Sequence, residues 1–567
     1  MKNFIQISNL KFLVKNSLLR WVFLVVILTV PSFTTLLQPG YFGHHDDLQI
    51  MRIYQMDKCI KDGQIPCRWV PDMGYGYGYP LFNYYPVMPS YLGELINLMG
   101  FSLVWSVKIV FLLSLIVSGI TMFLLARALW GNLGGLAASL FYVYAPYHAV
   151  DIYVRGAMAE GWSIAWAPLV FLSILLVIKN TNFKFVPLLA ISIALFLMSH
   201  NPLALIFTPV MGIWALILMW QKKNFSVIKL LIIGGLWGLG LAAFFTLPVL
   251  FEAKLVHIET LFIGYFNYLA HFVSLNQLFI SDFWGFGGSV WGDGDGMPFQ
   301  IGKLHSVITV ISVPFVAILW KKDRAKSLIV LLLISVFWGS AFLMHPRSNF
   351  IWERVTLLQN LQFPWRILSV TIFAASLLAG GLFLEVKKSF RLALAVMMII
   401  GLFAVYQPLF KIEKQIPLTD QEKLSGALWD MQQTAGIFDY LPKTAKMPPG
   451  KRASEGIQVL EGEAKITDLR KGSNWLSFSS DSTISAKLRL PIYDYPIWKV
   501  SVDTKQVSFD NKNELGQPTF VVDSGQHQIY AKLHNTPIRT ISNLLTVFSF
   551  ALLIWWGRKK WLQKNKK

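Results

Sequence analysis

Long apolar runs, interrupted by short charged breaks, follow one another along most of the chain. Many of them extend over roughly 17–25 residues, the length that an α-helix needs to cross the hydrocarbon core of a bilayer. The runs predict about twelve transmembrane helices. We expect them at 20–38, 102–127, 132–149, 160–178, 184–199, 203–220, 227–249, 305–320, 327–344, 364–386, 392–408 and 540–557.

The pattern changes after residue 408, where short alternating segments replace the apolar runs. NWLSFSS, STISAKLRL, YPIWKVSVD, PTFVVD and HQIYAKL alternate in polarity and are separated by Gly, Asp and Asn turns, which is typical of antiparallel strands. The sequence therefore predicts an α-helical polytopic membrane protein with a small C-terminal β-sandwich. We expect a transmembrane domain at 1–408 with a long first outer loop at 39–101, an extracytoplasmic mainly β domain at 409–538, and a last helix with a basic tail at 539–567.

Composition and charge agree with a membrane location. Hydrophobic residues make up 54% of the chain and charged residues 14%, whereas soluble proteins carry about 25% charge. The net charge is +20, but residues 410–537 hold 16 Lys and Arg against 15 Asp and Glu. The excess lies in the N-terminus, the short loops and the C-terminal tail, as the positive-inside rule predicts. This distribution argues against a nucleic-acid partner. We expect a multi-pass protein of the plasma membrane with both termini in the cytoplasm.

The N-terminal segment and the two cysteines bear on the same topology. Lys2, Lys11, Lys15 and Arg20 precede or open a long apolar run with no small-residue cleavage site after it, so we interpret this run as a retained helix rather than a signal peptide. Cys59 and Cys67 both fall in the first outer loop. An oxidising compartment would permit a disulfide there, and both the bridge and free thiols remain open.

Ionisable residues avoid the centres of the predicted helices. Those at predicted outer ends are Lys108, Glu160, His200, Glu252, His305 and Arg366, and Glu385 falls at an inner end. Transporters that move ions usually keep acidic groups near the middle of the membrane. The placement therefore weakens an ion-coupled transport function and indicates a cavity near the outer leaflet.

The run HHDD, His44 to Asp47, lies just after the first predicted helix. Asp46 and Asp47 repel each other, and a carboxylate in such a setting can serve as a general base. With the imidazole of His45, they also offer ligands to a divalent cation. A third interpretation is that one aspartate caps the amphipathic helix that follows.

Two arginines at the predicted outer ends suit a phosphate, because a guanidinium can engage two oxygens at once. Arg155 stands in YHAVDIYVRGAMAEGW, close to Asp151 and Glu160, and Arg366 stands in LQFPWRIL. An interfacial anchor or an Arg155–Glu160 ion pair is the alternative. His200 opens a tight turn between two helices, where it serves either the turn or a ligand.

Other motifs add little. DGDG at 293–296 lacks the rest of a calcium-binding loop and is interpreted mainly as a turn. The sequence contains no Walker A loop, no HExxH, no GxSxG and no dinucleotide-binding glycine motif. An ATP-driven pump and a membrane protease are therefore unsupported.

Taken together, the motifs resemble a known group of proteins. HHDD, IPCRWVPDMGYGYGYPLFNYYP, VDIYVRGAMAE, MSHNP, FFTLPVLFE, WGFGGSV, DGMPFQIG and LQFPWR occur in this order. They resemble the bacterial membrane proteins called 6-pyruvoyl-tetrahydropterin synthase-related, of the C-type glycosyltransferase (GT-C) superfamily. YLP at 440–442 and YPIWKVSVD resemble the outer domain of YfhO-like proteins. Cys67 in IPCRW departs from the proline expected there, which puts the local turn in doubt.

The resemblance implies an inverting sugar transfer from a polyprenyl-phosphate-linked sugar to an extracytoplasmic glycan or protein acceptor. In that superfamily an acidic residue of the first outer loop is the base or a metal ligand, and this role carries over to Asp46 and Asp47. His45, Arg155, Glu160, His200 and Arg366 are the candidate substrate-binding residues, and a divalent cation is the one cofactor considered. A lipid-linked-glycan flippase or transporter and a non-catalytic membrane scaffold remain as alternatives.

Overall fold

The structure is a computed structural model, and it describes residues 17–292 and 294–565. The basic residues Lys2, Lys11 and Lys15 and the turn residue Asp293 lie outside this described part. The chain divides into two compact units, each assembled from three stretches of sequence. The first comprises Met1–Asp47, Lys108–Gly238 and Asn267–Pro417, and the second comprises Leu48–Val107, Leu239–Phe266 and Leu418–Lys567.

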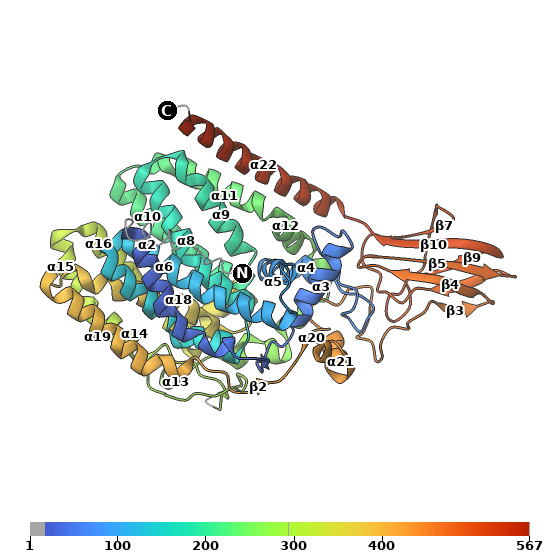
Figure 1. The fold of residues 1–567 in the computed structure, drawn as a ribbon, viewed down its shortest axis with the longest axis horizontal. Helices are drawn as coiled ribbons and strands as arrows, with labels where there is room; N and C mark the ends of the chain where they lie inside the picture. The colour runs from blue at the N-terminus through green and yellow to red at the C-terminus, as the bar shows by residue number, and fades with distance from the viewer. Residues whose placement is uncertain (1–16, 293, 566–567) are drawn as a thin grey trace, which may run out of the picture. The chain divides into compact units, whose positions relative to one another are not determined.

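The first unit is almost entirely helical (Figure 1). Its helices are α2 (Ser17–Thr29), α6 (Leu103–Val143, of which the first five residues belong to the second unit), α7 (Pro146–Ala149), α8 (Met158–Asn180), α9 (Val186–Leu197), α10 (Asn201–Lys222), α11 (Ile228–Leu241), α13 (Leu275–Phe279), α14 (Lys303–Ile311), α15 (Val313–Lys322), α16 (Arg324–Met344), α17 (Asn349–Arg354), α18 (Leu368–Gly381) and α19 (Lys388–Tyr406). Two short strands, β1 (Tyr41–Phe42) and β2 (Gln415–Ile416), pair antiparallel.

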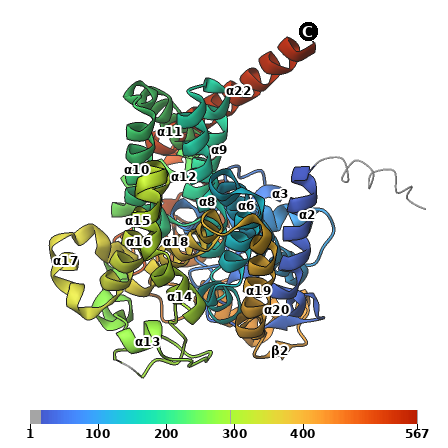
Figure 2. The same cartoon turned by 90° about the vertical axis from the view of Figure 1, so that its left-hand side faces the viewer.

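Helix α18 forms the core of this unit. Every residue from Leu368 to Gly381 is buried, and α10, α14 and α16 pack around it (Figure 2). Helix α6 approaches it so closely that a Cβ on Gly134 would lie 2.7 Å from the carbonyl oxygen of Gly380. A helix that is apolar on all sides and fully buried is the arrangement expected at the centre of a membrane bundle.

The chain is a multi-pass membrane protein, with fewer full-length spans than the twelve predicted. Within residues 17–292 and 294–565, eight helices are long and apolar enough to cross a membrane, or nine if the bent pair α11 and α12 (Ala243–Glu252) is one span. The predicted helices 102–127 and 132–149 correspond to the two helical parts of α6, which meet at a kink with non-helical backbone at Gly131. Two other predicted spans are short apolar helices at Ser17–Ser32 and Phe183–Leu197. The second of these, Phe183–Leu197, is shorter than the roughly 17–25 residues that a span needs, and the first begins at the first residue that the structure describes.

The second unit combines short helices with all the remaining strands. Its helices are α3 (Gln49–Lys61), α4 (Leu81–Tyr84), α5 (Met88–Leu98), α12, α20 (Asp420–Lys423), α21 (Gly426–Thr434) and α22 (Pro537–Asn565). Its strands are β3 (Gln458–Glu461), β4 (Lys465–Lys471), β5 (Trp475–Ser482), β6 (Ala486–Arg489), β7 (Trp498–Val502), β8 (Lys505–Val507), β9 (Thr519–Val522) and β10 (Gly525–Leu533).

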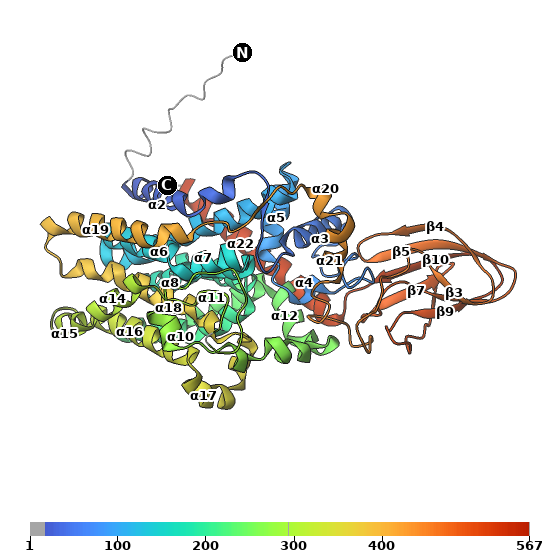
Figure 3. The same cartoon turned by 90° about the horizontal axis from the view of Figure 1, so that it is seen from below.

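The strands form two antiparallel sheets, with the orders β4-β5-β10-β7-β8 and β3-β6-β9 (Figure 3). Alternate residues are buried, as in β10, where Ile529, Ala531 and Leu533 point to the core. All five predicted strands are present, and the C-terminal antiparallel β region is confirmed. Strands β3, β4 and β8 were not predicted, because they carry few buried residues and so lack a clear alternation.

The first loop contributes α3, whose C-terminal end is linked to the segment after it. Cys59, in the last turn of α3, forms a disulfide with Cys67. This finding decides between the two alternatives for the cysteines. The helix begins at Gln49 with Leu48 at its N-cap and no side-chain capping bond, so neither Asp46 nor Asp47 occupies the cap position.

Candidate functional site

The segment that leads to HHDD is held by contacts within the first unit. Strand β1 pairs with β2 through Tyr41 and Ile416, and the next residue, Gly43, donates its N–H to the Lys414 carbonyl at 3.1 Å. The buried ammonium of Lys108, on α6, donates to the carbonyl oxygens of Gln38 and Gly40. An ammonium that satisfies free backbone carbonyls fixes the chain at this point.

His44 fills a space next to Gly156. Its Nε2 lies 3.0 Å from the Tyr41 hydroxyl, and its ring packs against Phe42 with centroids 4.8 Å apart. Gly156 has φ +62°, and a Cβ there would lie 2.1 Å from Nδ1 of His44. Glycine is therefore required at 156 both for its backbone conformation and for the approach of the imidazole.

The next two residues dock on the segment that carries Arg155. His45 donates its N–H to the Val154 carbonyl at 3.0 Å, and Asp46 donates its N–H to the Arg155 carbonyl at 2.9 Å. The exposed imidazole of His45 lies 2.9 Å from the Phe286 carbonyl through Nε2. HHDD and Arg155, which are distant in sequence, are thus adjacent through their backbones.

Replacing Gly156 by alanine is expected to destabilise the first unit by about 1–3 kcal/mol, the usual range for a strained left-handed residue. The added Cβ would also displace His44 and weaken the two backbone bonds that hold His45 and Asp46. Thermal unfolding of the purified protein, compared with a Gly212→Ala control, measures the effect. A Cβ on Gly212 would meet no atom within 4 Å, and this glycine lies in a regular helix, so an equal loss in both variants would contradict the argument.

Arg155 is buried in a cluster of polar side chains. It follows a π-helical turn, Val150–Val154, and its Nη1 lies 2.6 Å from Oδ1 of Asp151 and 2.9 Å from Oε2 of Glu160. Tyr147 donates its hydroxyl to Oε1 of Glu160 at 2.5 Å. The predicted Arg155–Glu160 ion pair is therefore present, and Arg155 is engaged by two carboxylates at once.

Arg366 reaches the same cluster from the segment that opens α18. Its Nε lies 3.6 Å from Oε2 of Glu160, and its Nη1 donates to the Leu361 carbonyl at 2.7 Å and to Oε1 of Gln362 at 3.0 Å. The neighbouring Trp365 lies under the Arg155 guanidinium, 4.5 Å from the ring centroid. Such a contact stabilises a partly desolvated cation.

The two titratable groups at the edge of the cluster respond to burial. Burial raises the pKa of Asp151, with repulsion from Glu160 adding to the effect and Arg155 opposing it. Burial lowers the pKa of His200 to about 3, with Glu160 opposing this and Arg366 adding to it. His200 is therefore neutral at neutral pH, and its Nδ1 accepts the Leu203 N–H at 3.3 Å, which caps α10.

Some buried polar atoms of the cluster make no hydrogen bond to any described residue. They are Oδ2 of Asp151, Oε2 of Glu160 and Nε of Arg366, although Oε2 of Glu160 forms ion pairs with Nη1 of Arg155 at 2.9 Å and with Nε of Arg366 at 3.6 Å. Buried polar atoms are rarely left unpaired. Oδ2 of Asp151 is therefore the acceptor of the cluster that is left for a polar group or water.

Asp46 and Asp47 are half-buried, and Asp46 contacts the segment of Arg155 through its backbone N–H. Among residues 17–292 and 294–565, no group of three or more His, Cys, Asp or Glu side chains is arranged to hold a metal ion. Two adjacent carboxylates alone are a minimal ligand set for a divalent cation.

The structure thus gathers Arg155, Glu160, His200 and Arg366 in one buried cluster, and backbone hydrogen bonds join His45 and Asp46 to the segment that carries Arg155. Tyr147 and Trp365, which the sequence did not single out, contact Arg155 directly. Trp365 also donates its Nε1–H to Oγ of Ser289 at 3.2 Å, and that hydroxyl lies 2.8 Å from Nδ1 of His271. Ser289 belongs to the motif WGFGGSV and Trp365 to LQFPWR. The sequence contains both motifs, but only the structure shows that they are in contact.

Chemically, the cluster combines two guanidiniums with two carboxylates. Arg155 and Arg366 face Glu160, and Arg155 also pairs with Asp151. Arg366 has more capacity than Arg155 to bind an anion, because Arg155 already contacts two carboxylates.

Comparisons with known proteins provide no family. No family model matches the chain. An uncharacterized protein of Lactococcus lactis subsp. cremoris (strain MG1363) is 23% identical over 244 residues, which covers 41% of this chain and 39% of the relative. The chain thus spans well under half the length of that curated relative.

The solved structures that are similar to the chain include the following three proteins. For arabinofuranosyltransferase AftD from Mycobacteria, identity is 14% and the TM-score 0.40, covering 69% of this chain and 26% of that one. For ArnT from Cupriavidus metallidurans, bound to undecaprenyl phosphate, identity is 13% and the TM-score 0.42, covering 68% of this chain and 63% of that one. For the oligosaccharyltransferase AglB from Archaeoglobus fulgidus, in complex with an inhibitory peptide and a dolichol-phosphate, identity is 12% and the TM-score 0.41, covering 70% of this chain and 56% of that one. At these scores the likeness carries no functional inference.

Proposed function

We propose that this protein is a membrane glycosyltransferase of the GT-C type, which transfers a sugar from a polyprenyl-phosphate donor to an acceptor outside the plasma membrane. The observation that supports it best is the pair of backbone hydrogen bonds from His45 and Asp46 to Val154 and Arg155. These bonds join the backbone of HHDD to the segment that carries the buried Arg155. A base beside a cationic site is what transfer from a phosphate donor requires.

The reaction proceeds by a single inverting displacement. The carboxylate of Asp46 or Asp47 accepts the proton of an acceptor hydroxyl, and that oxygen forms a bond to C1 of the sugar. The bond between C1 and the phosphate oxygen breaks, and the polyprenyl phosphate leaves with the electron pair. Holding donor and acceptor in one place supplies much of the rate.

Arg366 stabilises the charge on the departing phosphate in this scheme. Its Nε is buried and lies 3.6 Å from Glu160, a distance longer than a direct hydrogen bond. Arg155 and Glu160 act mainly as positioning residues, because Arg155 carries the carbonyl that binds Asp46 and pairs with Glu160 at 2.9 Å. His200, neutral and engaged as a helix cap, maintains the shape of the site.

Asp46→Asn and Asp47→Asn test the role of the base. We expect one of the two to reduce transfer by at least about 100-fold, the lower range for loss of general base catalysis. The assay uses the full chain in liposomes with a panel of radiolabelled polyprenyl-phosphate sugars and a mixed glycan acceptor. Asp282→Asn is the matched control, since Asp282 is exposed and pairs with Lys303 at 2.5 Å.

The two other outcomes contradict the proposal in different ways. Transfer that both substitutions leave unchanged would exclude the aspartates as the base. Donor lipid that crosses the bilayer while no sugar is transferred would support a flippase instead.

A further inference from the structure

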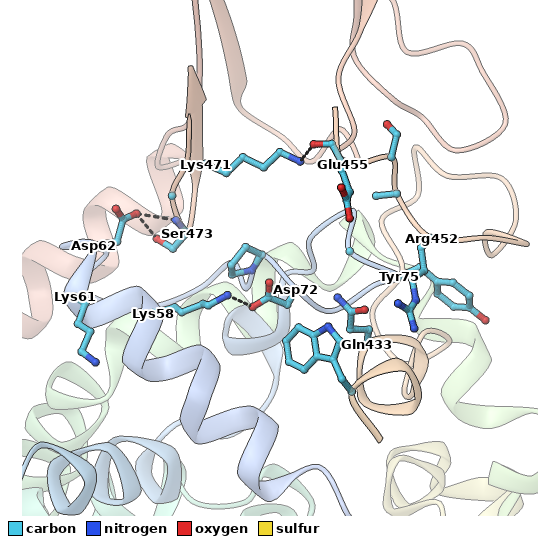
Figure 4. A pocket seen from close by; sticks show the side chains of 16 residues that line it. Lys58, Lys61, Asp62, Asp72, Tyr75, Gln433, Arg452, Glu455, Lys471 and Ser473 are labelled. Carbon is cyan, nitrogen blue, oxygen red and sulfur yellow. Dashed lines mark hydrogen bonds and ion pairs between the residues drawn. The ribbon is translucent and has the colours of Figure 1, made fainter. Parts of the chain in front are cut away.

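The second unit contains a cleft that none of the candidate site residues lines. Its cavity volume is about 630 Å³, within the range of pockets that bind small organic ligands. It is lined by α3, the segment 71–76, α21, the segment 452–455 and the turn between β4 and β5 (Figure 4). All of these stretches belong to the same compact unit.

The walls of the cleft are tied to one another by hydrogen bonds. Tyr75 donates its N–H to the Gln433 carbonyl at 2.9 Å, and its own carbonyl accepts the Ala453 N–H at 2.9 Å. The Asp62 carboxylate accepts from the N–H of Ser473 at 2.8 Å and from its hydroxyl at 2.7 Å (Figure 4). The cavity is therefore a built feature that joins the first loop to the C-terminal region, rather than a gap between loose loops.

Two aromatic rings line this cleft, and one of them stands on strained backbone. Tyr75 has φ +62°, a conformation that costs a residue with a Cβ about 1–3 kcal/mol. It lies between Gly74 and Gly76 in a run of glycines and tyrosines. Trp429, on α21, is half-buried and packs edge-on against Tyr54. A strained tyrosine in a run rich in glycine indicates that its ring is needed at this position.

The polar lining is mixed and nearly balanced in charge. Lys58 pairs with Asp72 at 2.6 Å, and Lys471 donates to the Glu455 carbonyl at 2.9 Å (Figure 4). The two remaining cations of the lining, Lys61 and Arg452, pair with Asp57 and Asp430. Donors and acceptors thus alternate around the cleft without a strong field of one sign, which does not favour a polyanion.

We propose that this cleft binds a neutral oligosaccharide. A sugar ring presents an apolar face of C–H groups, which suits Tyr75 and Trp429, and a rim of hydroxyls that donate and accept hydrogen bonds at once. A lysine that is paired with a carboxylate offers such a rim both a hydrogen-bond donor and a hydrogen-bond acceptor. The proposal concerns binding alone and stands whether or not the first unit transfers sugar.

Binding of defined glycans to the full chain tests this proposal. The protein in nanodiscs is titrated with the tetrasaccharides of glucose, mannose, galactose and N-acetylglucosamine and with tetragalacturonate. We expect saturable binding of at least one neutral glycan and a loss of about tenfold in affinity for Trp429→Ala and for Tyr75→Gly. Glycine accepts the positive φ of residue 75, so the second variant removes the ring without straining the backbone.

Two controls separate a lost ring from a disturbed fold. Trp429→Phe keeps an aromatic face and should bind more tightly than Trp429→Ala. Tyr265→Ala removes an exposed tyrosine of the same unit that does not line the cleft, and it should bind like wild type. Absence of saturable binding to all neutral glycans would overturn the proposal, as would equal affinity in the ring variants. Tighter, salt-sensitive binding of tetragalacturonate would assign the cleft to polyanions instead.

Discussion

Replacing Glu160 by glutamine is expected to lower the free energy of unfolding by about 3–5 kcal/mol, the usual result of breaking a buried ion pair. Its carboxylate lies 2.9 Å from Arg155 and 3.6 Å from Arg366, and the side chain of Glu160 is fully buried. Without that charge the two arginines repel each other in a region from which water is largely excluded. Reversible unfolding in mixed dodecyl maltoside and SDS micelles measures the loss.

A matched control and a double-mutant cycle isolate this interaction. Glu385→Gln also removes an ion-paired glutamate. Its partner Lys322, 2.5 Å away, is mostly exposed, so the loss in the free energy of unfolding should stay below about 1 kcal/mol. Arg155→Gln combined with Glu160→Gln should cost less than the sum of the two single changes, because each single change already removes the ion pair between these two side chains. Additive losses would show that the two side chains do not act as a pair.

The helices could be predicted from apolar runs, but their lengths could not. The sequence shows where charge interrupts a run, and it does not show whether the backbone breaks there. At Gly131 the backbone of α6 does break, and two helices meet at a kink there, in agreement with the two predicted spans. The run 227–249 contains no charge at its break near residue 242, and there the chain divides into α11 and α12.

The candidate site was only partly accessible from the sequence. Motifs such as YVRGAMAE and LQFPWR indicate arginines at similar depth, but depth does not place Arg155 and Arg366 against one glutamate. That contact depends on the π-helical turn before Arg155 and on the 3-10 turn Pro364–Ile367. Backbone hydrogen bonds between His45 and Val154 leave no trace in residue type, because any residue can donate its N–H.

Local chemistry explains the role of His200 in the turn. The sequence left His200 to serve either the turn or a ligand, and the structure has it at the N-cap of α10. A histidine that is buried and neutral can accept a backbone N–H through its unprotonated nitrogen. Sequence patterns favour Ser, Thr, Asp and Asn at this position, so the sequence does not predict a histidine cap.

Glu252→Gln is expected to produce a loss of similar size, about 3–5 kcal/mol, in the second unit. Its Oε2 accepts from Nε of Arg539 at 2.8 Å and from Nδ2 of Asn83 at 3.0 Å, and its Oε1 accepts the Thr536 hydroxyl at 2.5 Å. Arg539 is 1% exposed and lies 4.7 Å from the centroid of the Tyr495 ring. Glutamine keeps the shape but removes the charge that compensates this buried guanidinium.

Micelle unfolding of the full chain, followed through proteolysis of the C-terminal strands, measures the effect on this unit. Glu461→Gln is the control, since Glu461 pairs with Lys487 at 2.8 Å on the surface and is 70% exposed, and it should change the stability little. A loss below about 1 kcal/mol for Glu252→Gln would contradict the expectation. Such a result would mean that other groups stabilise the Arg539 guanidinium sufficiently. Among the described residues, the one further acceptor in contact with it is the Pro496 carbonyl, 3.4 Å from Nη1. A single long hydrogen bond of that kind does not replace a charged partner in a buried site, so we expect the larger loss.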